Sequence, residues 1–357
     1  MSKFHSIKVQ DIYKATKDCS VLTFDIPENL KQVFQYKSGQ YLTLKAIIDN
    51  NEARRSYSLC SSPTENKWQV AVKKINGGLF STFINDEVKT GDIIELMPPT
   101  GKFFSETNPT KTKNYIAFAA GSGITPIFSI IKNQLETEPN ATFKLFYLNR
   151  TVKSIVFKEE IELLKNKYFG RFEIFHFLTK EFRNIELLNG RFTSEKIQTL
   201  SKSIIDIENT DECYICGPQE MIFLIRDELV KAGLEKDKIH FELFTTSSSD
   251  SDKERIKKLV EQKIEGTDIT IIDGGKEFHF TMTDEFDNIL DSAMAAGADL
   301  PFACKGGVCC TCRCKIISGT VEMKVNYALD EAEVAKGLIL SCQAVPTSQN
   351  VVVEFGV

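Results

Sequence analysis

The chain has 357 residues, 42% of them hydrophobic, which is enough for two or three domains with cores of their own. Its net charge of −5 argues against nucleic acid as the partner. No apolar run reaches the roughly 18 residues of a membrane-spanning helix. The first segment, MSKFHSIKVQ, does not resemble a secretory signal, so a cytoplasmic location with reduced thiols is expected.

Residues 1–107 are expected to form an antiparallel β-barrel. Segments such as 20–27 (SVLTFDIP) and 40–48 (QYLTLKAII) alternate β-branched or aromatic residues with polar ones, and Gly or Pro closes most of these segments. This pattern is typical of short antiparallel strands joined by turns.

One of these strands carries a candidate cofactor-binding stretch, RRSYSLCSSP at 54–63. The guanidinium of Arg55 suits a phosphate group and the ring of Tyr57 suits a flat aromatic ligand, and Ser58 adds a hydroxyl beside them. Taken alone, the stretch could also be a strand with solvated arginines.

A second candidate stretch is INGGLFSTFI at 75–84, which places Gly78 and Ser81 at a predicted helix start, with Thr82 next. Backbone N–H groups and a hydroxyl at such a position form a site for an anion. A plain turn is the alternative interpretation.

Residues 108–245 follow a different pattern. Apolar segments such as 114–120 (NYIAFAA) and 142–148 (TFKLFYL) are separated by gaps long enough for helices, and 156–168 (VFKEEIELLKNKY) has helical periodicity. Alternating strands and helices predict a doubly wound parallel sheet.

The first strand of this sheet runs into a glycine loop. In the stretch 115–131 (YIAFAAGSGITPIFSII), Gly121 and Gly123 precede a helix, with Thr125 expected at its N-cap and Pro126 at its first position. The loop lacks the GxGxxG fingerprint, so this pattern alone is weak evidence for a dinucleotide. A later stretch, 213–221 (CYICGPQEM), ends a strand in the same way.

The segment 149–157 (NRTVKSIVF) holds Arg150 and Ser154 just past the second strand of the sheet. A basic residue at this position suits the 2′-phosphate of NADP, whereas an acidic residue favours NAD. The sequence therefore favours NADPH over NADH, with a solvated surface arginine as the alternative explanation.

Residues 246–265, which are serine-rich and then charged, are expected to be a linker. The remaining residues, 266–357, form a distinct acidic domain, because their 13 Asp and Glu against 6 Lys and Arg give a net charge of −7.

This acidic domain contains the stretch FACKGGVCCTCRCK at 302–315. Cys304, Cys309 and Cys312 follow the pattern Cx4CxxC, and Cys342 comes after a further 29 residues. That is the spacing of a plant-type [2Fe–2S] cluster. Two bridged irons need four thiolates from different sides, so a tight loop supplies three of them and a later segment supplies the fourth.

A structural zinc site is the alternative for these cysteines, although such sites usually combine two CxxC pairs and this chain has one. A different register would use Cys310 or Cys314 as a ligand. Both cysteines fall outside the cluster spacing and are expected to be bystanders.

The segment 266–357 resembles the plant-type ferredoxin domain, a β-grasp fold. The upstream stretches at 54–63, 75–84, 115–131 and 213–221 resemble, in the same order, the motifs of the ferredoxin–NADP reductase family. The whole chain is thus similar to a reductase of that family with a fused C-terminal ferredoxin domain.

This resemblance implies FAD in the barrel and roles for particular residues. Arg55 would contact the FAD pyrophosphate, Tyr57 would pack on the isoalloxazine, and Ser58 would hydrogen-bond near N5. Cys216 would lie beside the nicotinamide, and Phe244 would cover the flavin unless it belongs to the core. The other implied contacts to FAD or NADP are Gly78, Ser81, Thr82, Gly121, Gly123, Thr125, Arg150, Ser154, Gly217 and Pro218.

The sequence therefore predicts an NADPH-dependent oxidoreductase that uses FAD and a [2Fe–2S] cluster to pass single electrons to an outside acceptor. The domain order, with CKGGVCCTCRCK and YLNRTVKSIVF, resembles the reductase subunits of ring-1,2-phenylacetyl-CoA epoxidases of phenylacetate catabolism. That resemblance implies a diiron oxygenase subunit as partner. The alternatives are a reductase for another oxygenase or a fatty-acid desaturase, and a zinc-stapled binding protein without redox chemistry.

Overall fold

The computed structural model describes residues 4–104, 106–244, 250–261, 263–264 and 266–356. The chain divides into two compact units, one of which is His5–Phe244, while the other holds Thr245–Val357 together with Met1–Phe4. Within the described residues, no helix has the length and apolar character needed to cross a membrane. The predicted domain boundary after residue 245 remains a prediction. The two compact units divide one residue earlier, between 244 and 245.

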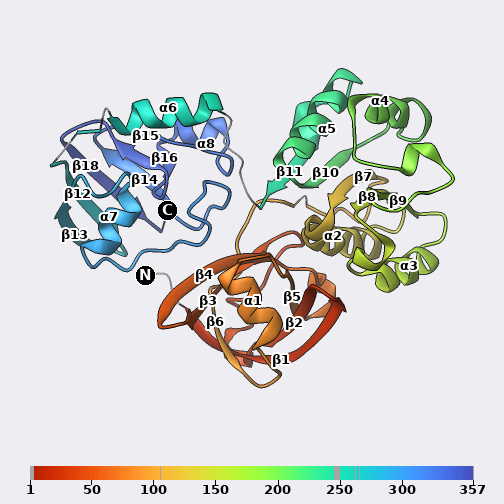
Figure 1. The fold of residues 1–357 in the computed structure, drawn as a ribbon, viewed down its shortest axis with the longest axis horizontal. Coiled ribbons are helices and arrows are strands. Elements are labelled where there is room, and N and C mark those ends of the chain that lie inside the picture. The colour runs from red at the N-terminus through yellow and green to blue at the C-terminus, as the bar shows by residue number, and fades with distance from the viewer. Residues whose placement is uncertain (1–3, 105, 245–249, 262, 265, 357) are drawn as a thin grey trace. The chain divides into compact units, whose positions relative to one another are not determined.

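The first part of the larger unit is a six-stranded antiparallel sheet in the order β4-β3-β6-β1-β2-β5. An isolated bridge between Leu59 and Val70 brings the two edge strands together and closes the sheet into a barrel, and helix α1 (Leu79–Asp86) lies across it (Figure 1). The strands are β1 (His5–Thr16), β2 (Cys19–Asp25), β3 (Tyr41–Ile48), β4 (Asn51–Ser58), β5 (Trp68–Lys73) and β6 (Ile93–Leu96).

Strand β2 is buried on both faces. Leu22 and Phe24 point into the core of the barrel, whereas Cys19 and Val21 belong to the core of the neighbouring α/β half. Because successive side chains of a strand point to opposite faces, a strand that is apolar throughout can serve two cores at once. Strand β2 therefore joins the two halves of this unit.

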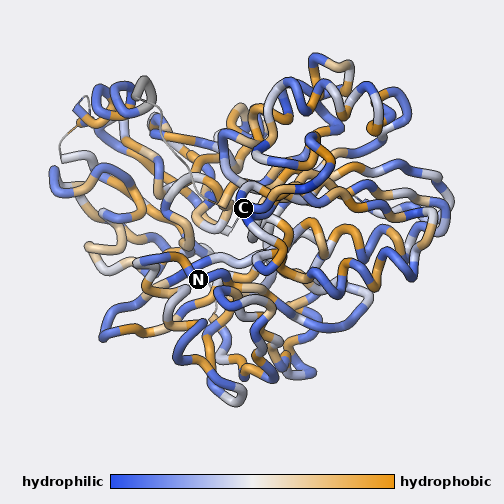
Figure 2. The backbone as a smooth tube through the Cα atoms, turned by 45° about the vertical axis from the view of Figure 1, so that its right-hand side comes forward, coloured by the Kyte–Doolittle hydropathy of each residue, from blue (hydrophilic) through white to orange (hydrophobic). Residues whose placement is uncertain are grey.

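The second half of the unit is a five-stranded parallel sheet in the order β11-β10-β7-β8-β9. Helices α2 and α3 lie on one face of it, and α4 and α5 on the other (Figure 1). In Figure 2 the helices of this half alternate between hydrophobic and hydrophilic residues, as expected of helices with one face on a sheet. The bounds are β7 (Asn114–Ala120), α2 (Ile124–Thr137), β8 (Thr142–Asn149), α3 (Lys158–Lys167), β9 (Phe172–Leu178), α4 (Ser194–Ser203), β10 (Glu212–Gly217), α5 (Gln219–Lys231) and β11 (Ile239–Leu243).

The strand order of this sheet reverses beside β7. The chain leaves β7 for β8 on one side and later returns to place β10 on the other side. Ligands of open parallel sheets bind outside the carboxyl ends of the strands at such a switch point. Gly123 lies there, and a Cβ atom on it would come within 2.2 Å of the backbone oxygen of Cys216, so glycine is required for this close approach.

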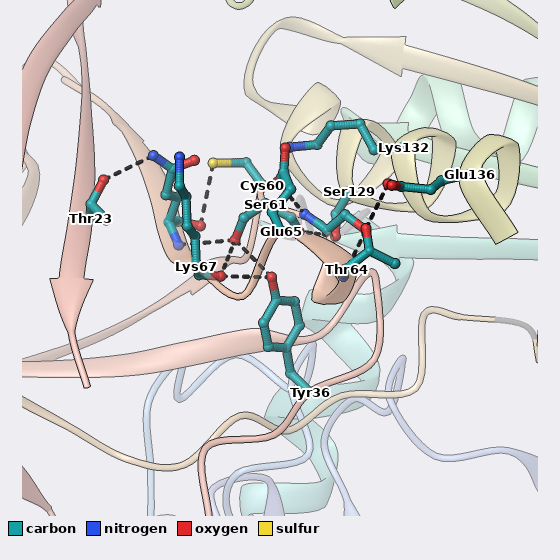
Figure 3. Close-up of polar contacts among 12 residues, drawn as sticks. Thr23, Tyr36, Cys60, Ser61, Thr64, Glu65, Lys67, Ser129, Lys132 and Glu136 are labelled. Atoms are coloured by element: carbon teal, nitrogen blue, oxygen red, sulfur yellow. Dashed lines mark hydrogen bonds and ion pairs between the residues drawn. The ribbon is translucent and has the colours of Figure 1, made fainter. Parts of the chain in front are cut away.

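Polar contacts connect helix α2 with the segment that follows strand β4 (Figure 3). The Ser129 hydroxyl donates to the backbone oxygen of Ser61 at 2.5 Å. The ammonium group of Lys132 pairs with Glu65 at 2.6 Å. A third contact runs from the Thr64 hydroxyl to Glu136. Together with the shared core along β2, these contacts hold the end of β4 against the parallel sheet.

The expected N-cap at Thr125 is wrong, and so is the expected first helical position at Pro126, because Pro126 is the third residue of the helix. A 3-10 turn over Gly121–Gly123 runs directly into α2, so the cap position falls on Gly123. The Thr125 hydroxyl lies inside the first helical turn and donates to the backbone oxygen of Ser122 at 3.0 Å instead of accepting from a backbone N–H. Helix α2 therefore begins directly after the glycines, at Ile124.

The smaller unit is built on a five-stranded mixed sheet in the order β13-β12-β18-β14-β16, with a separate two-stranded sheet of β15 and β17. Strands β12 and β18 are parallel, while the other pairs are antiparallel. The bounds are α6 (Asp250–Glu261), β12 (Asp268–Asp273), β13 (Lys276–Thr281), α7 (Ile289–Ala295), β14 (Arg313–Ser318), β15 (Val321–Met323), α8 (Glu331–Ala335), β16 (Leu338–Leu340), β17 (Ala344–Pro346) and β18 (Asn350–Phe355). The antiparallel barrel, the parallel sheet and this β-grasp arrangement confirm the predicted fold class.

Part of the predicted linker, 246–265, forms helix α6. Residues 246–249, 262 and 265 of that stretch lie outside the described residues. Within α6, Leu259 is buried, and the Arg255 guanidinium donates to the backbone oxygen of Lys324. Helix α6 therefore packs against the rest of the smaller unit, to which it belongs. The polar composition of the segment did not indicate this packing.

Candidate functional site

Three polar side chains meet where the end of β4 contacts the carboxyl edge of the parallel sheet. The Ser58 hydroxyl donates to a carboxylate oxygen of Glu242 at 3.0 Å. Cys216 on β10 is the register neighbour of Glu242 on β11, and its side chain is fully buried. The structure thus brings together Ser58 and Cys216, which the sequence nominated, with Glu242, which it did not.

The environment of these groups favours their neutral forms. Burial raises the pKa of Glu242 to about 8, although the hydrogen bond from Ser58 partly opposes that rise. Burial and the neighbouring Glu242 raise the pKa of the Cys216 thiol well above its ordinary value. A thiol with such a pKa is a poor nucleophile. The arrangement therefore suits contact with an uncharged ring rather than covalent catalysis.

Tyr57 and Arg55 come from the same strand as Ser58 but differ in exposure. The Tyr57 ring is partly buried and lies 6.0 Å from the ring of Phe80, centroid to centroid. Arg55 is exposed, and its guanidinium donates to the backbone oxygen of Arg54 at 2.7 Å. A ring fixed by packing and an exposed guanidinium can serve a flat ligand and its phosphate, respectively.

Helix α1 begins at this part of the barrel, with Gly78 as its N-cap. The Ser81 hydroxyl accepts a hydrogen bond from the backbone N–H of Ile75 at 3.1 Å and donates to the backbone oxygen of Gly78 at 3.2 Å. Ser81 thus shapes the turn from within. The backbone N–H of Thr82 donates to the backbone oxygen of Gly78 at 2.9 Å, which makes it the first N–H with a partner inside the helix. The helical N–H groups that precede Thr82 have no such partner and are suited to bind an anion.

The carboxyl edge of the parallel sheet carries the remaining predicted nucleotide residues. Gly121 adopts a φ of +52°, in the left-handed region that favours glycine. A Cβ atom on Gly217 would lie 2.5 Å from the Met221 side chain, and Pro218 is the N-cap of α5. Phe244 follows β11 and is 37% exposed. These residues share one edge, although they come from three different strand ends.

Arg150 lies at this edge beside a lysine that sequence reasoning missed. The backbone N–H of Lys180 donates to the backbone oxygen of Arg150 at 2.8 Å, and both side chains are exposed. Ser154 is engaged in its own turn, where its hydroxyl donates to the backbone oxygen of Thr151 at 2.7 Å. Arg150 and Lys180 are thus two exposed cationic residues on adjoining segments at this edge, and Ser154 stabilises the turn that follows Arg150.

The four predicted cluster cysteines lie in the smaller unit as two pairs. The sulfur atoms of Cys304 and Cys309 are 3.1 Å apart, and the thiols of Cys312 and Cys342 are hydrogen-bonded to each other. The Cys309 thiol, helped by backbone N–H groups, lowers the pKa of Cys304 to about 6 despite its burial. Cys312 similarly lowers the pKa of Cys342.

This donor set fits a two-iron cluster. Each iron of a [2Fe–2S] cluster takes two thiolates, and the structure supplies two pairs, each with one thiol of lowered pKa. A single zinc ion would instead require four ligands around one point. Among the residues that the structure describes, no three or more His, Cys, Asp or Glu side chains are arranged so that they could hold a single metal ion.

The two other cysteines of the loop lie apart from these pairs. The Cys310 thiol contacts the backbone oxygen of Ala328 at 3.3 Å. Cys314 is fully buried in strand β14, and burial raises its pKa. Neither placement favours the alternative register.

Three family models match the chain, in the order of its folded parts. An oxidoreductase FAD-binding domain matches residues 6–104, an oxidoreductase NAD-binding domain matches 118–227, and a 2Fe-2S iron-sulfur cluster binding domain matches 271–347. A 1,2-phenylacetyl-CoA epoxidase component from Escherichia coli K12 is 39% identical over 99% of this chain and 98% of its own length. The chain belongs to the family of ferredoxin reductase-type components of oxygenases.

Another relative agrees with this assignment, and a solved structure shares the fold. The ferredoxin reductase component of 3-ketosteroid-9-alpha-monooxygenase from Rhodococcus rhodochrous is 31% identical over 98% of this chain and 96% of its own length. Phthalate dioxygenase reductase has the same fold, with a TM-score of 0.60 at 23% identity over 99% of this chain and 98% of that one. This chain is therefore an oxidoreductase with FAD, nucleotide and [2Fe–2S] domains.

The raised pKa of Glu242 predicts a pH-dependent effect of removing its charge. Between pH 4.5 and 8 the folded chain holds a proton that the unfolded chain has lost, so wild-type stability falls as pH rises through this window. In Glu242→Gln this loss is absent. The thermal midpoint of each protein can be measured by the release of flavin fluorescence. The midpoint of the variant minus that of the wild type should increase as the pH rises from 5 to about 8.5. A difference between the two proteins that stays constant with pH would contradict the raised pKa.

Proposed function

We propose that this chain is the NADPH-dependent reductase of a multicomponent oxygenase, and that its electron acceptor is the diiron subunit of a 1,2-phenylacetyl-CoA epoxidase. The observation that carries the proposal is the presence, in one chain, of the strand-edge cluster around Ser58 and the two cysteine pairs. The relative named as a component of that epoxidase matches nearly the full length of both chains, which supports this partner.

When bound, FAD takes an electron pair from the reduced nicotinamide and releases electrons singly, and the cluster carries single electrons. The role of the protein is to orient these groups. Tyr57 would pack against the flavin ring, and Ser58 would offer its hydroxyl near N5. Cys216 would lie on the nicotinamide side of this site, because it is buried near the end of β10 and is the register neighbour of Glu242 on β11.

Glu242 fixes the Ser58 hydroxyl through their 3.0 Å hydrogen bond. Near pH 7 the carboxyl of this partly buried residue is mostly protonated, since its pKa is raised to about 8. A protonated carboxyl adds no negative charge beside the bound rings, and it can hold or exchange a proton at its own oxygen. Phe244, at the end of the same segment, would cover the flavin face.

The phosphate groups of FAD would be held at the barrel. Arg55 offers an exposed guanidinium, and the N-terminus of α1 after Gly78 offers backbone N–H groups. Ser81 would keep that turn in shape, and Thr82 follows it. On the parallel sheet, the segments around Gly121, Gly123 and Thr125, and around Gly217 and Pro218, would approach the nucleotide backbone at the switch point.

The preference for NADPH rests on the pair of cations at the edge of the sheet. Arg150 and Lys180 follow the ends of the neighbouring strands β8 and β9, are linked through their backbones at 2.8 Å, and are both exposed. A 2′-phosphate between them would gain two charge-assisted contacts that the bare ribose of NADH cannot make. Ser154 would support this loop from its own turn.

The proposed cluster ligands are Cys304, Cys309, Cys312 and Cys342. Other acceptors form the second candidate function, because relatives in the family include the reductase components of 3-ketosteroid-9-alpha-monooxygenase and glycine betaine monooxygenase. Those relatives are 31% and 26% identical, compared with 39% for the epoxidase component, which is why the epoxidase is favoured.

Arg150→Ala and Lys180→Ala should each raise the KM for NADPH while kcat changes little, because the 2′-phosphate is remote from the transferred electrons. Loss of a charged hydrogen bond costs about 1.5–3 kcal/mol, or roughly tenfold to a hundredfold in KM. Steady-state kinetics with NADPH and NADH measure this effect. The KM for NADH should stay unchanged, as should both constants in Lys165→Ala, a charge-matched control on helix α3. Equal effects on the two nucleotides would overturn the assignment.

Cys304→Ser, Cys309→Ser, Cys312→Ser and Cys342→Ser should each abolish the visible iron–sulfur absorbance, because a hydroxyl is a poor replacement for a thiolate ligand. The flavin spectrum should remain in all four, since FAD belongs to the other unit. Cys310→Ser is the matched control and should keep the cluster. If Cys310→Ser lost the cluster and Cys309→Ser kept it, the proposed ligand set would be wrong.

A further inference from the structure

Gln343 follows the last of the proposed cluster ligands and is buried, with 6% of its surface exposed. Its side-chain amide donates to the backbone oxygen of Lys305 at 2.9 Å and lies 3.6 Å from the sulfur of Cys342, within hydrogen-bonding distance for sulfur. Because the Lys305 oxygen can only accept, the NH2 end of the amide must face the cysteine loop. One side chain therefore touches both segments that supply the ligands.

The backbone around Gln343 is fixed independently of this contact. Its N–H donates to the backbone oxygen of Leu340 at 2.8 Å, and its own oxygen accepts from the N–H of Lys324 at 2.9 Å. The side chain thus starts from a rigid position between β16 and β17. A buried amide held in this way presents a donor of fixed direction.

The loop on the other side of the amide has an unusual backbone. Lys305 has a φ of +50°, which is uncommon for a residue with a Cβ atom. This conformation directs the N–H of Gly306 to the sulfur of Cys304 at 3.3 Å. The Lys305 oxygen is the group that Gln343 binds, so the amide stabilises the backbone turn on which that N–H···S contact depends.

We propose that Gln343 is a positioning residue for the cluster, and that its amide braces the cysteine loop against Cys342 and raises the reduction potential of the bound cluster. The inference rests on the proposed ligand set. Reduction adds negative charge to the cluster and its sulfur ligands, and an N–H group aimed at a sulfur stabilises that charge. Hydrogen bonds to the sulfurs are one of the terms that set iron–sulfur potentials.

Gln343→Met tests this inference, because methionine has a similar length, lacks an N–H donor and is flexible enough to fill the space. Loss of one hydrogen bond to a charged group changes an equilibrium by roughly tenfold. For a one-electron couple that corresponds to about 59 mV. The midpoint potential of the variant should therefore become more negative by about that amount in a redox titration followed by visible absorbance and EPR.

A second variant, Gln343→Glu, keeps the shape but replaces the donor with an acceptor. Its potential should be at least as negative as that of Gln343→Met, because it loses the donor and adds a negative charge. The matched control is Gln349→Met in the same unit, since the Gln349 amide donates to the backbone oxygen of Gly266 and not to the cysteine loop. The control should keep the wild-type potential and EPR spectrum.

Unchanged potentials in both Gln343 variants, with the cluster present, would overturn the inference and leave the proposed function intact. Loss of the cluster in both variants while Gln349→Met retains it would limit Gln343 to cluster assembly and would overturn its role in the potential. A wild-type protein that carries no iron–sulfur cluster would instead contradict the proposed function itself.

Discussion

The hydrogen bond between Ser58 and Glu242 joins the end of a barrel strand to the end of a parallel strand, and the proposed flavin and nucleotide sites depend on that junction. Two other features make it possible. Strand β2 contributes side chains to the cores of both halves, so the barrel cannot shift without disrupting the α/β core. Gly123 lets the start of α2 pass the end of β10 at a distance that no larger residue would permit.

Charge is distributed around this junction in a way that separates two tasks. The interior groups, Glu242 and Cys216, have raised pKa values and stay mostly neutral near pH 7. The exposed groups, Arg55, Arg150 and Lys180, are cations. A neutral interior suits ring-to-ring electron transfer, whereas an exposed cationic rim suits phosphate recognition. In the smaller unit, each cysteine pair contains one thiol whose pKa is lowered by its partner.

The parts of this picture that depend on short, local patterns could be predicted from the sequence. The Cx4CxxC spacing, the stretch 54–63 with Ser58 and the stretch 213–221 with Cys216 each occupy contiguous residues, and Cys342 follows the cysteine loop at a fixed spacing, so their chemistry can be recognised without a fold. The alternation of strands and helices likewise predicted the parallel sheet. The structure adds that the four cysteines form two pairs, a detail that spacing alone does not contain.

What the sequence could not predict depends on contacts between distant segments. Glu242 is 184 residues from Ser58, and nothing in the stretch around it, 240–244 (HFELF), indicates that its carboxyl contacts a serine of the barrel. Lys180 reaches Arg150 because their strands are neighbours in the sheet, and Gln343 reaches Lys305 across 38 residues. Thr125 was misplaced because the 3-10 turn before α2 moved the helix start, and α6 was missed because its buried contacts come from the rest of its unit.

The central claim is that one chain carries electrons from NADPH through a flavin to an iron–sulfur cluster. Anaerobic addition of NADPH to the full-length holoprotein, followed by visible absorbance and by EPR of samples frozen during the reaction, tests it most directly. The account predicts that the flavin absorbance bleaches and that the EPR signal of a reduced [2Fe–2S] cluster appears in the same samples. Flavin bleaching with a cluster that NADPH leaves oxidised, although dithionite reduces it, would contradict the claim.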